Sequence, residues 1–430
     1  MRTVRQDGQT PSPWRARRFP VRTFASLAIR DYRYLWLGLV STSLGLWMDQ
    51  VARGWLMYSL TRSALDLGLV MAVRGLPTLI FGVVAGVVAD RYGRKAQLLL
   101  SQGTNCLLNL VLALLVATQR IQPWHVYLTG FLAGTVQAFQ QPARQSLLSD
   151  LVGRENLMNA IGLNSAAFNL ARSVGPALAG VVIALVGVAG SYVLQAGLYA
   201  VATVWTVQMR VPQEREEARQ RASRQASFLG NLGEVFAYLW THRLILALVL
   251  LGVVPLMLGM PFTSLLPVFA VDILGVGASG QGLMLAGVGV GALVGAIGVA
   301  SLGEGQARGV YLLGASALLG VSLVLFSLSP WLAMAVGMAF LTGLFRTVYT
   351  TQTQTALQML APDHLRGRIM SIYLLDRGLV PIGSILAGAL AHAWGAPTAV
   401  ALMGGAVVVC TLAIALAVPS VRTVNLRARG

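Results

Sequence analysis

The stretch that decides the fold reads Gly86-Val87-Val88-Ala89-Asp90-Arg91-Tyr92-Gly93-Arg94-Lys95. It places one acid and three bases between two apolar stretches, 66–88 and 96–117. Each of these stretches is long enough to cross roughly 30 Å of hydrocarbon as a helix. Glycine supplies the backbone angles of a tight turn, and the charges can pair with one another or with the end of a neighbouring helix. The segment therefore predicts a polar turn between two membrane-spanning helices.

The composition of the whole chain is that of a membrane protein. Of its 430 residues, 56% are hydrophobic and 11% are charged, whereas a soluble domain carries about 25% charged residues. The net charge is +17, and every basic residue except Lys95 is arginine. Most of these arginines lie between the apolar stretches, and they form no continuous basic face. We therefore expect no nucleic-acid partner.

The chain contains twelve apolar stretches, and we expect all of them to be helices. Open sheet edges cannot sit in lipid, and the alternation of a transmembrane barrel is absent. Gly287, Gly291 and Gly295, spaced four apart, predict a close helix–helix contact. The predicted spans are 34–58, 66–88, 96–117, 124–142, 159–187, 190–210, 242–271, 279–301, 309–328, 331–355, 369–390 and 395–418.

A charged segment divides the spans into six plus six. The predicted fold is all-α, with two pseudo-symmetric six-helix bundles, a pattern typical of repeat-built transporters. The linker is interpreted as a solvated helix or tether, or alternatively as a regulatory surface. The predicted parts are a basic N-terminal segment 1–33, a first bundle 34–210, the linker 211–241, a second bundle 242–418 and a tail 419–430.

The basic residues predict the orientation in the membrane. With the N-terminus inside, 25 of the 32 fall in cytoplasmic segments, Arg62 and Arg120 fall outside, and the rest are intramembrane. Cytoplasmic loops carry an excess of arginine and lysine. We therefore expect a multi-pass protein of the inner or plasma membrane with both termini in the cytoplasm.

Two motifs resemble those of the major facilitator superfamily. The segment with Gly86, Asp90, Arg91, Gly93, Arg94 and Lys95 is similar to its motif A, which implies a cytoplasmic gate that contacts the eleventh helix. Span five contains Gly175, Pro176 and Gly180 at the spacing of the helix-five motif of the superfamily's antiporters. Ala171 and Ala179 stand where glycine is usual. Small residues there permit close packing, and proline bends the helix.

Other stretches resemble the branch that contains enterobactin and macrolide exporters, namely 54–61, 140–145 and 365–368. Two departures limit what this resemblance implies. Gly130 occupies the position of the arginine that many drug–proton antiporters carry in helix four, so their proton relay cannot be copied across. The second-half copy of motif A, 298–307, lacks both the Asp-Arg pair and the basic ending.

Charges inside the spans are costly and usually face a bundle interior or a cavity. Asp49 and Asp376 are candidate proton or cation sites. Arginines near them can attract anionic substrate groups or alter carboxylate pKa values. The alternative is local neutralisation, with Asp49 paired to Arg53 and Asp376 to Arg346. The substrate or gating candidates are Arg53, Arg74, Arg172, Arg346 and Arg377.

Polar residues of spans one, four and ten are candidates to line a cavity, because the superfamily places these helices around its central pathway. Ordinary helix packing is the alternative, although buried amides need partners. Met257, Met260 and Phe262 of span seven would add an adaptable wall. The polar candidates are Gln50, Gln137, Gln140 and Gln352, with Trp47, Gln141 and Gln354 beside them.

These patterns favour a secondary active transporter and not an enzyme. The histidines and cysteines lack the spacing of a metal site, and no nucleophile–base pair is evident. We expect no cofactor, a proton gradient as the energy source, an amphipathic small molecule such as a drug or siderophore as substrate, contact with membrane lipids, and a monomer. The alternatives are a lipid or lysolipid translocator without proton coupling and a non-transporting membrane scaffold.

Overall fold

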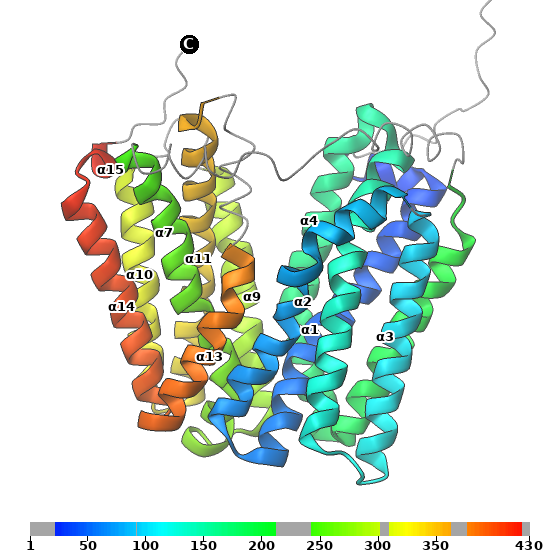
Figure 1. The fold of residues 1–430 in the computed structure, drawn as a ribbon, viewed down its shortest axis with the longest axis horizontal. Helices are drawn as coiled ribbons and strands as arrows, with labels where there is room; N and C mark the ends of the chain where they lie inside the picture. Colours follow the sequence, from blue (N-terminus) through cyan, green and yellow to red (C-terminus); the bar gives the residue numbers. More distant parts are fainter. Residues whose placement is uncertain (1–21, 92, 212–241, 302–308, 363–375, 424–430) are drawn as a thin grey trace, which may run out of the picture.

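The computed structural model describes residues 22–91, 93–211, 242–301, 309–362 and 376–423. Helices form two groups that lie side by side, one from each half of the chain (Figure 1). No strand occurs in the ranges just given. The N-terminal half contains η1 (Arg22–Ala28), α1 (Arg30–Thr61), α2 (Ala64–Arg91), α3 (Arg94–Ala117) and α4 (Pro123–Gln208).

The C-terminal half begins with an interrupted helix, α7 (Arg243–Gly259), η2 (Met260–Leu265), α8 (Leu266–Val268) and η3 (Phe269–Ile273). A 3-10 segment and a π-helical turn therefore break the seventh predicted span. The remaining helices are α9 (Gly277–Ser301), α10 (Gly309–Ser327), α11 (Leu332–Leu360), α13 (Asp376–Trp394), α14 (Ala396–Ala417) and α15 (Ser420–Thr423).

Helix α4 covers three predicted spans and bends at two glycines. Gly153 and Gly187 have φ angles of 69° and 76°, a left-handed conformation that glycine adopts without steric cost. The predicted end of span four at residue 142 is wrong, because the helix continues to Gly153. Apolar side chains at the helical spacing of Ala143, Leu147 and Leu148 are buried against α1 and α3, so the extension packs as core.

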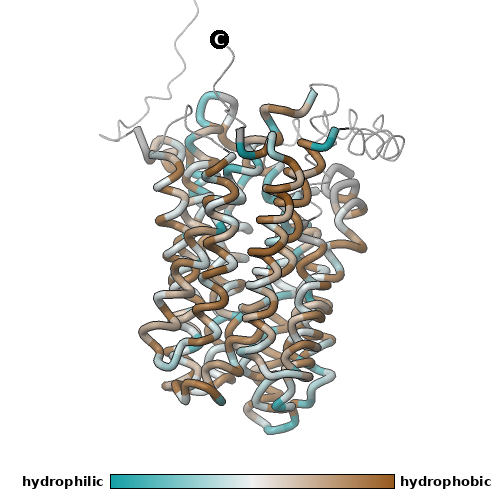
Figure 2. The backbone as a smooth tube through the Cα atoms, turned by 90° about the vertical axis from the view of Figure 1, so that its left-hand side faces the viewer, coloured by the Kyte–Doolittle hydropathy of each residue, from teal (hydrophilic) through white to brown (hydrophobic). Residues whose placement is uncertain are grey.

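The exterior of the helices is apolar, as a membrane environment requires. Eight helices in the described ranges are long and apolar enough to span a bilayer. Hydrophobic positions dominate along their length (Figure 2). Leu100, Leu114 and Leu185 are each more than 60% exposed, at 73%, 64% and 78%. Such leucines face lipid in a protein of this class, and the multi-pass fold class is confirmed.

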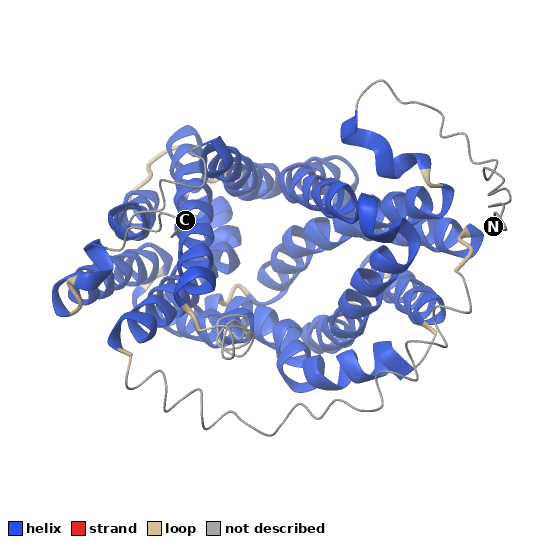
Figure 3. Ribbon diagram, turned by 90° about the horizontal axis from the view of Figure 1, so that it is seen from above, coloured by secondary structure: helices blue, strands red, loops and turns tan. Residues whose placement is uncertain are grey.

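The two ends of the molecule differ. We call the end where α2 ends, α3 begins, α4 ends and α7 begins the linker end, and the opposite end, where α1 meets α2 and η3 meets α9, the far end. The halves approach each other at the far end and spread apart toward the linker end (Figure 1). Viewed from the linker end, their helices lie around a shared central axis (Figure 3).

Glycines bring the two halves together at the far end. A Cβ atom on Gly68 of α2 would lie 2.3 Å from the carbonyl oxygen of Ser384 in α13. A Cβ atom on Gly282 of α9 would lie 2.5 Å from the carbonyl oxygen of Pro176 in α4. A Cβ atom on Gly180 would also come too close to the carbonyl oxygen of Ala278 in α9. The close packing predicted for the helix-five motif is therefore confirmed. Only glycine permits backbones to approach this closely.

The predicted glycine row packs α9 against α11 within the C-terminal half. A Cβ atom on Gly287, Gly291 or Gly295 would lie 3.0, 1.9 or 2.7 Å from a carbonyl oxygen of α11. The close contact predicted from the four-residue spacing is therefore confirmed.

We expect the substitution Gly291→Ala to destabilise the protein by about 1–3 kcal/mol, because its new methyl group would overlap the Phe340 carbonyl oxygen and force the helices apart. Thermal unfolding of the purified protein in detergent measures the effect. Gly298→Ala on the same helix is the matched control, since nothing lies within 4 Å of its Cβ position. Equal unfolding temperatures for the two variants would contradict the packing described.

Candidate functional site

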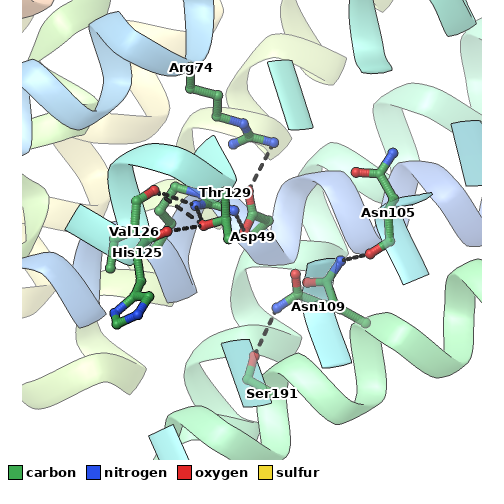
Figure 4. Close-up of polar contacts among 10 residues, drawn as sticks. Asp49, Arg74, Asn105, Asn109, His125, Val126, Thr129 and Ser191 are labelled. Carbon is green, nitrogen blue, oxygen red and sulfur yellow. Dashed lines mark hydrogen bonds and ion pairs between the residues drawn. The ribbon is translucent and has the colours of Figure 1, made fainter. Parts of the chain in front are cut away.

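Asp49, Arg53 and Arg74 form a buried ion cluster inside the N-terminal half (Figure 4). Arg53 lies one helical turn after Asp49 on α1, and its Nε and Nη2 donate to the two carboxylate oxygens at 3.1 and 3.0 Å. Arg74 of α2 approaches Asp49 Oδ2 at 3.0 Å. The local pair proposed as an alternative role for Asp49 is therefore present, with a second guanidinium that sequence spacing did not predict.

Arg53 also connects the cluster to α4. Its side chain is 2% exposed, and Nη1 donates to the Val126 carbonyl at 3.0 Å and to Thr129 Oγ1 at 2.9 Å. These bonds satisfy a guanidinium that would be very costly to bury alone. The cluster joins α1, α2 and α4 and retains one net positive charge.

Gly130 explains how the cluster fits against α4. A Cβ atom at Gly130 would lie 3.5 Å from Arg53 Nη1 and 3.9 Å from Arg74 Cβ. The arginines of α1 and α2 therefore occupy the space beside the position where many antiporters carry the helix-four arginine. Helix four therefore lacks the arginine noted as missing in the sequence, but guanidinium groups from α1 and α2 supply positive charge at the same place.

A polar face of α3 lies next to the cluster. Asn105 and Asn109 donate to backbone carbonyls one turn earlier, at 3.1 and 2.7 Å. A small cavity of about 10 Å³ separates these asparagines from Asp49 and Tyr199, which is room for about one water molecule. Buried amide groups without protein partners are normally satisfied by such water. The polar residues of this face are Ser101, Gln102, Asn105 and Asn109, each at most 6% exposed.

A second polar group lies at the far end and joins the two halves. Tyr58 of α1 donates to Asp272 of η3, and the Arg62 guanidinium lies 3.7 Å from the same carboxylate. We call Tyr58, Arg62 and Asp272 the far-end latch. A cavity of about 250 Å³ adjoins it, lined in part by Trp55, Tyr58 and Gly275. Among the ion pairs of the described residues, Arg62–Asp272 alone links one half to the other.

The turn at 86–95 anchors α3 within its own half. The Arg94 guanidinium is 3% exposed and pairs with Asp150 of α4. Lys95 Nζ donates to the carbonyls of Val207 and Met209 at 2.9 and 2.6 Å. A cation at a helix C-terminus is favourable, and pairing with a neighbouring helix end is confirmed. The contact with the eleventh helix that the resemblance implies concerns Asp90 and Arg91, whose side chains lie outside the described residues, while Gly86 and Gly93 lie in α2 and just before α3.

Arg172 lies where the two halves meet. A Cβ atom on Gly289 of α9 would contact its carbonyl oxygen at 2.7 Å. Its guanidinium stacks over the Trp47 ring, 5.4 Å from the ring centroid. Arg346 of α11 is near enough for the two positive charges to repel. No ion pair joins Arg172 to an acidic side chain among the described residues.

The other predicted site residues do not form one group. Gln140 and Gln352 are buried, Gln50 and Gln137 are partly exposed, and Gln137 borders the small cavity beside the ion cluster. The side chains of Asp376 and Arg377, at the start of α13, lie outside the described residues, and so does the Asp376–Arg346 pairing proposed from sequence. Phe262 is buried in the central core and packs edge to face against Phe326.

Sequence reasoning missed several polar residues. Arg144, assigned to a cytoplasmic connection, is instead buried in α4 and donates to Thr42 Oγ1 of α1 at 2.8 Å. Asp272 lies one residue beyond the predicted span 242–271 and was given no role. The asparagines of α3 carried a signal, because polar residues spaced three to four apart along an apolar helix indicate one polar face.

The family model described as transmembrane secretion effector (MFS_3) matches residues 21–429. The chain therefore belongs to this family of the major facilitator superfamily. It is 25% identical to the staphyloferrin A transporter of Staphylococcus aureus, over 86% of this chain and 91% of that protein. It is 28% identical to the multidrug efflux pump Tap of Mycolicibacterium fortuitum (80% and 85%) and 29% identical to the enterobactin exporter EntS of Citrobacter koseri (73% and 74%). The resemblance seen in the motifs is confirmed.

Solved structures agree on the fold. A POT family transporter superposes with a TM-score of 0.71 at 14% identity, covering 91% of this chain and 96% of that one. A bacterial homologue of the human lysosomal transporter Spinster, in an inward-facing and occupied conformation, gives a TM-score of 0.68 at 15% identity, with coverages of 92% and 99%. At these identities the likeness concerns the fold alone.

We expect the two arginines of the ion cluster to differ in their effect on stability. Arg53→Gln should lower the free energy of unfolding by about 3–5 kcal/mol, because it leaves a buried carboxylate short of its main partner. Arg74→Gln should cost about 1 kcal/mol, since Asp49 retains Arg53 and the Arg74 side chain is 17% exposed. Thermal unfolding in detergent measures both, and equal losses would rule out this division of roles.

We expect Asp272→Asn to loosen the contact between the halves without unfolding either of them. The test uses a background in which Cys106 and Cys410 are replaced by serine and a cysteine is introduced at the buried Ala278. The rate at which maleimide labels this cysteine should rise about tenfold, which corresponds to roughly 1.4 kcal/mol in the free energy of opening the contact. Asp66→Asn is the matched control, because it breaks a far-end bond to Tyr127 within one half. Labelling that rises equally in both variants, or in neither, would refute the latch.

Proposed function

We propose that this protein is a secondary active exporter of amphipathic small molecules that works by alternating access and is driven by proton entry. The observation that carries the proposal is the unequal contact between the halves, which are packed at the far end and spread toward the linker end. Such an arrangement supports access from one side. The curated relatives, a siderophore transporter, a multidrug pump and a siderophore exporter, support the assignment to export.

The linker end faces the cytoplasm in this proposal, and the protein resides in the inner or plasma membrane. The arginine excess supports this orientation, because the end of α4 and the start of α7, which flank the arginine-containing linker in sequence, lie at the linker end, as does the break between α2 and α3 in the basic segment 86–95. The far-end latch then closes the outer side, where protons enter. Its opening, coupled to closure at the linker end, would expose the substrate pathway to the outside.

Asp49 and Asp376 are the carboxylates proposed to carry the proton. Asp49 is engaged by two guanidinium groups, so a proton there has to displace one of them. Arg74 is the group to be displaced, since it makes one contact where Arg53 makes two and is more exposed. Protonation of Asp49 would thereby release α2 from α1 and bias the equilibrium between the two access states.

The proposal requires no cofactor and no catalytic chemistry. The proton gradient supplies the energy, and binding followed by a change of access performs the transport. One chain contains both halves, so a monomer suffices. Membrane lipids surround the apolar exterior.

We expect everted vesicles that contain the protein to accumulate drugs or siderophores when an inward-acid gradient is imposed. Asp49→Asn or Asp376→Asn should reduce gradient-driven accumulation at least tenfold, because the variant side chain cannot exchange a proton. Asp31→Asn at the linker end is the matched control and should retain wild-type uptake. Uptake measured with and without the gradient gives the coupling directly.

Uptake that is the same with and without the gradient, and the same in wild type and both variants, would reject proton coupling. Gradient-independent flux of a fluorescent lysolipid would instead favour a lipid translocator. No transport of any compound would favour a non-transporting scaffold.

A further inference from the structure

Arg172 and Trp47 form a donor-rich site on the path between the halves. No hydrogen bond or ion pair joins the Arg172 guanidinium to another described residue, although it stacks on Trp47 at 5.4 Å. The indole Nε1 of Trp47 is itself buried without a hydrogen-bond partner in the described part of the chain. The two groups together offer six N–H donors and no acceptor.

No acid in the described part of the chain neutralises this site. The acid closest to Trp47 along the chain is Asp49, but its two carboxylate oxygens are bonded to Arg53 and Arg74. A guanidinium in a low-dielectric region that has no acidic partner among the described residues favours the uptake of an anion.

The site also has an apolar wall and lies at the contact between the halves. The rings of Trp47 and Phe168 pack edge to face, with centroids 5.8 Å apart. Arg172 meets α9 of the other half through its own backbone, at Gly289. Arg172 and Trp47 each keep part of their surface exposed, while Trp47 Nε1 itself is buried.

We propose that Arg172 and Trp47 bind the anionic group of the transported molecule, so that the substrates are acidic amphiphiles with an aromatic or acyl body. This inference rests on the proposed function and narrows its substrate class. Arg172 donates a charge-assisted pair of hydrogen bonds to a carboxylate or comparable oxyanion. Trp47 donates one more and packs against the apolar body.

The test compares three probes of one shape: 1-naphthaleneacetate, its methyl ester and 1-naphthylmethylamine. Binding to the full chain in neutral detergent is measured by calorimetry. We expect the acid to bind at least tenfold more tightly than the ester or the amine. Arg172→Gln should weaken acid binding at least tenfold, Arg172→Lys should weaken it less, and Trp47→Phe should weaken it several-fold. Arg120→Gln, at an exposed turn, should have no effect.

A purely structural arginine would behave differently. Because Arg172 has no ion-pair partner in the described part of the chain, Arg172→Gln should leave the unfolding temperature of the ligand-free protein unchanged or raised. Equal affinities for the three probes, no binding of the acid, or full acid binding by Arg172→Gln would overturn the inference.

Failure of this inference is distinguishable from failure of the proposed function. Gradient-driven uptake of amines by wild type, with no preference for acids, would leave export intact and remove the anion site. Tight, Arg172-dependent acid binding without any gradient-driven uptake would retain the site and reject proton-coupled export.

Discussion

The close approach of helix backbones at glycine is the constraint on which the arrangement of this protein depends. Within lipid, apolar side chains gain little by leaving their surroundings, so helices associate through packing. Gly68 and Gly282 let carbonyl oxygens of one half reach the Cα atoms of the other, and Gly291 does the same within the C-terminal half. Contacts of this kind are dense yet contain no strong bonds. They hold the halves together at the far end.

Charges occupy two kinds of position in this framework. Asp49, Arg53 and Arg74 are mutually bonded and join helices of one half, while Arg62 and Asp272 join the halves at their rim. Arg172 differs from these mutually bonded charges in having an aromatic contact and no acidic partner among the described residues, which is the basis on which we assigned it to the substrate.

Much of the fold was predictable, and less of the site. Long apolar stretches and the glycine spacing in α9 predicted helices and their close contact, because both properties are local in sequence. The Asp49–Arg53 pair was predictable since residues four apart face each other on a helix. Arg74 and Thr129 were not, because they come from other helices. The burial of Arg144 was not predicted, because its partner Thr42 comes from another helix and the contact depends on how α1 and α4 pack.

The sequence by itself determined that this chain spans a membrane as helices in two halves and belongs to the major facilitator superfamily. Hydrophobic length, arginine distribution and local motifs are properties of neighbouring residues, and they specify each helix separately. Only the tertiary structure decided which charges become partners: Asp49 with two arginines, Asp272 with Tyr58 and Arg62, and Arg172 with Trp47. The reason is that these contacts join residues on different helices, whose relative rotation depends on packing across the whole bundle.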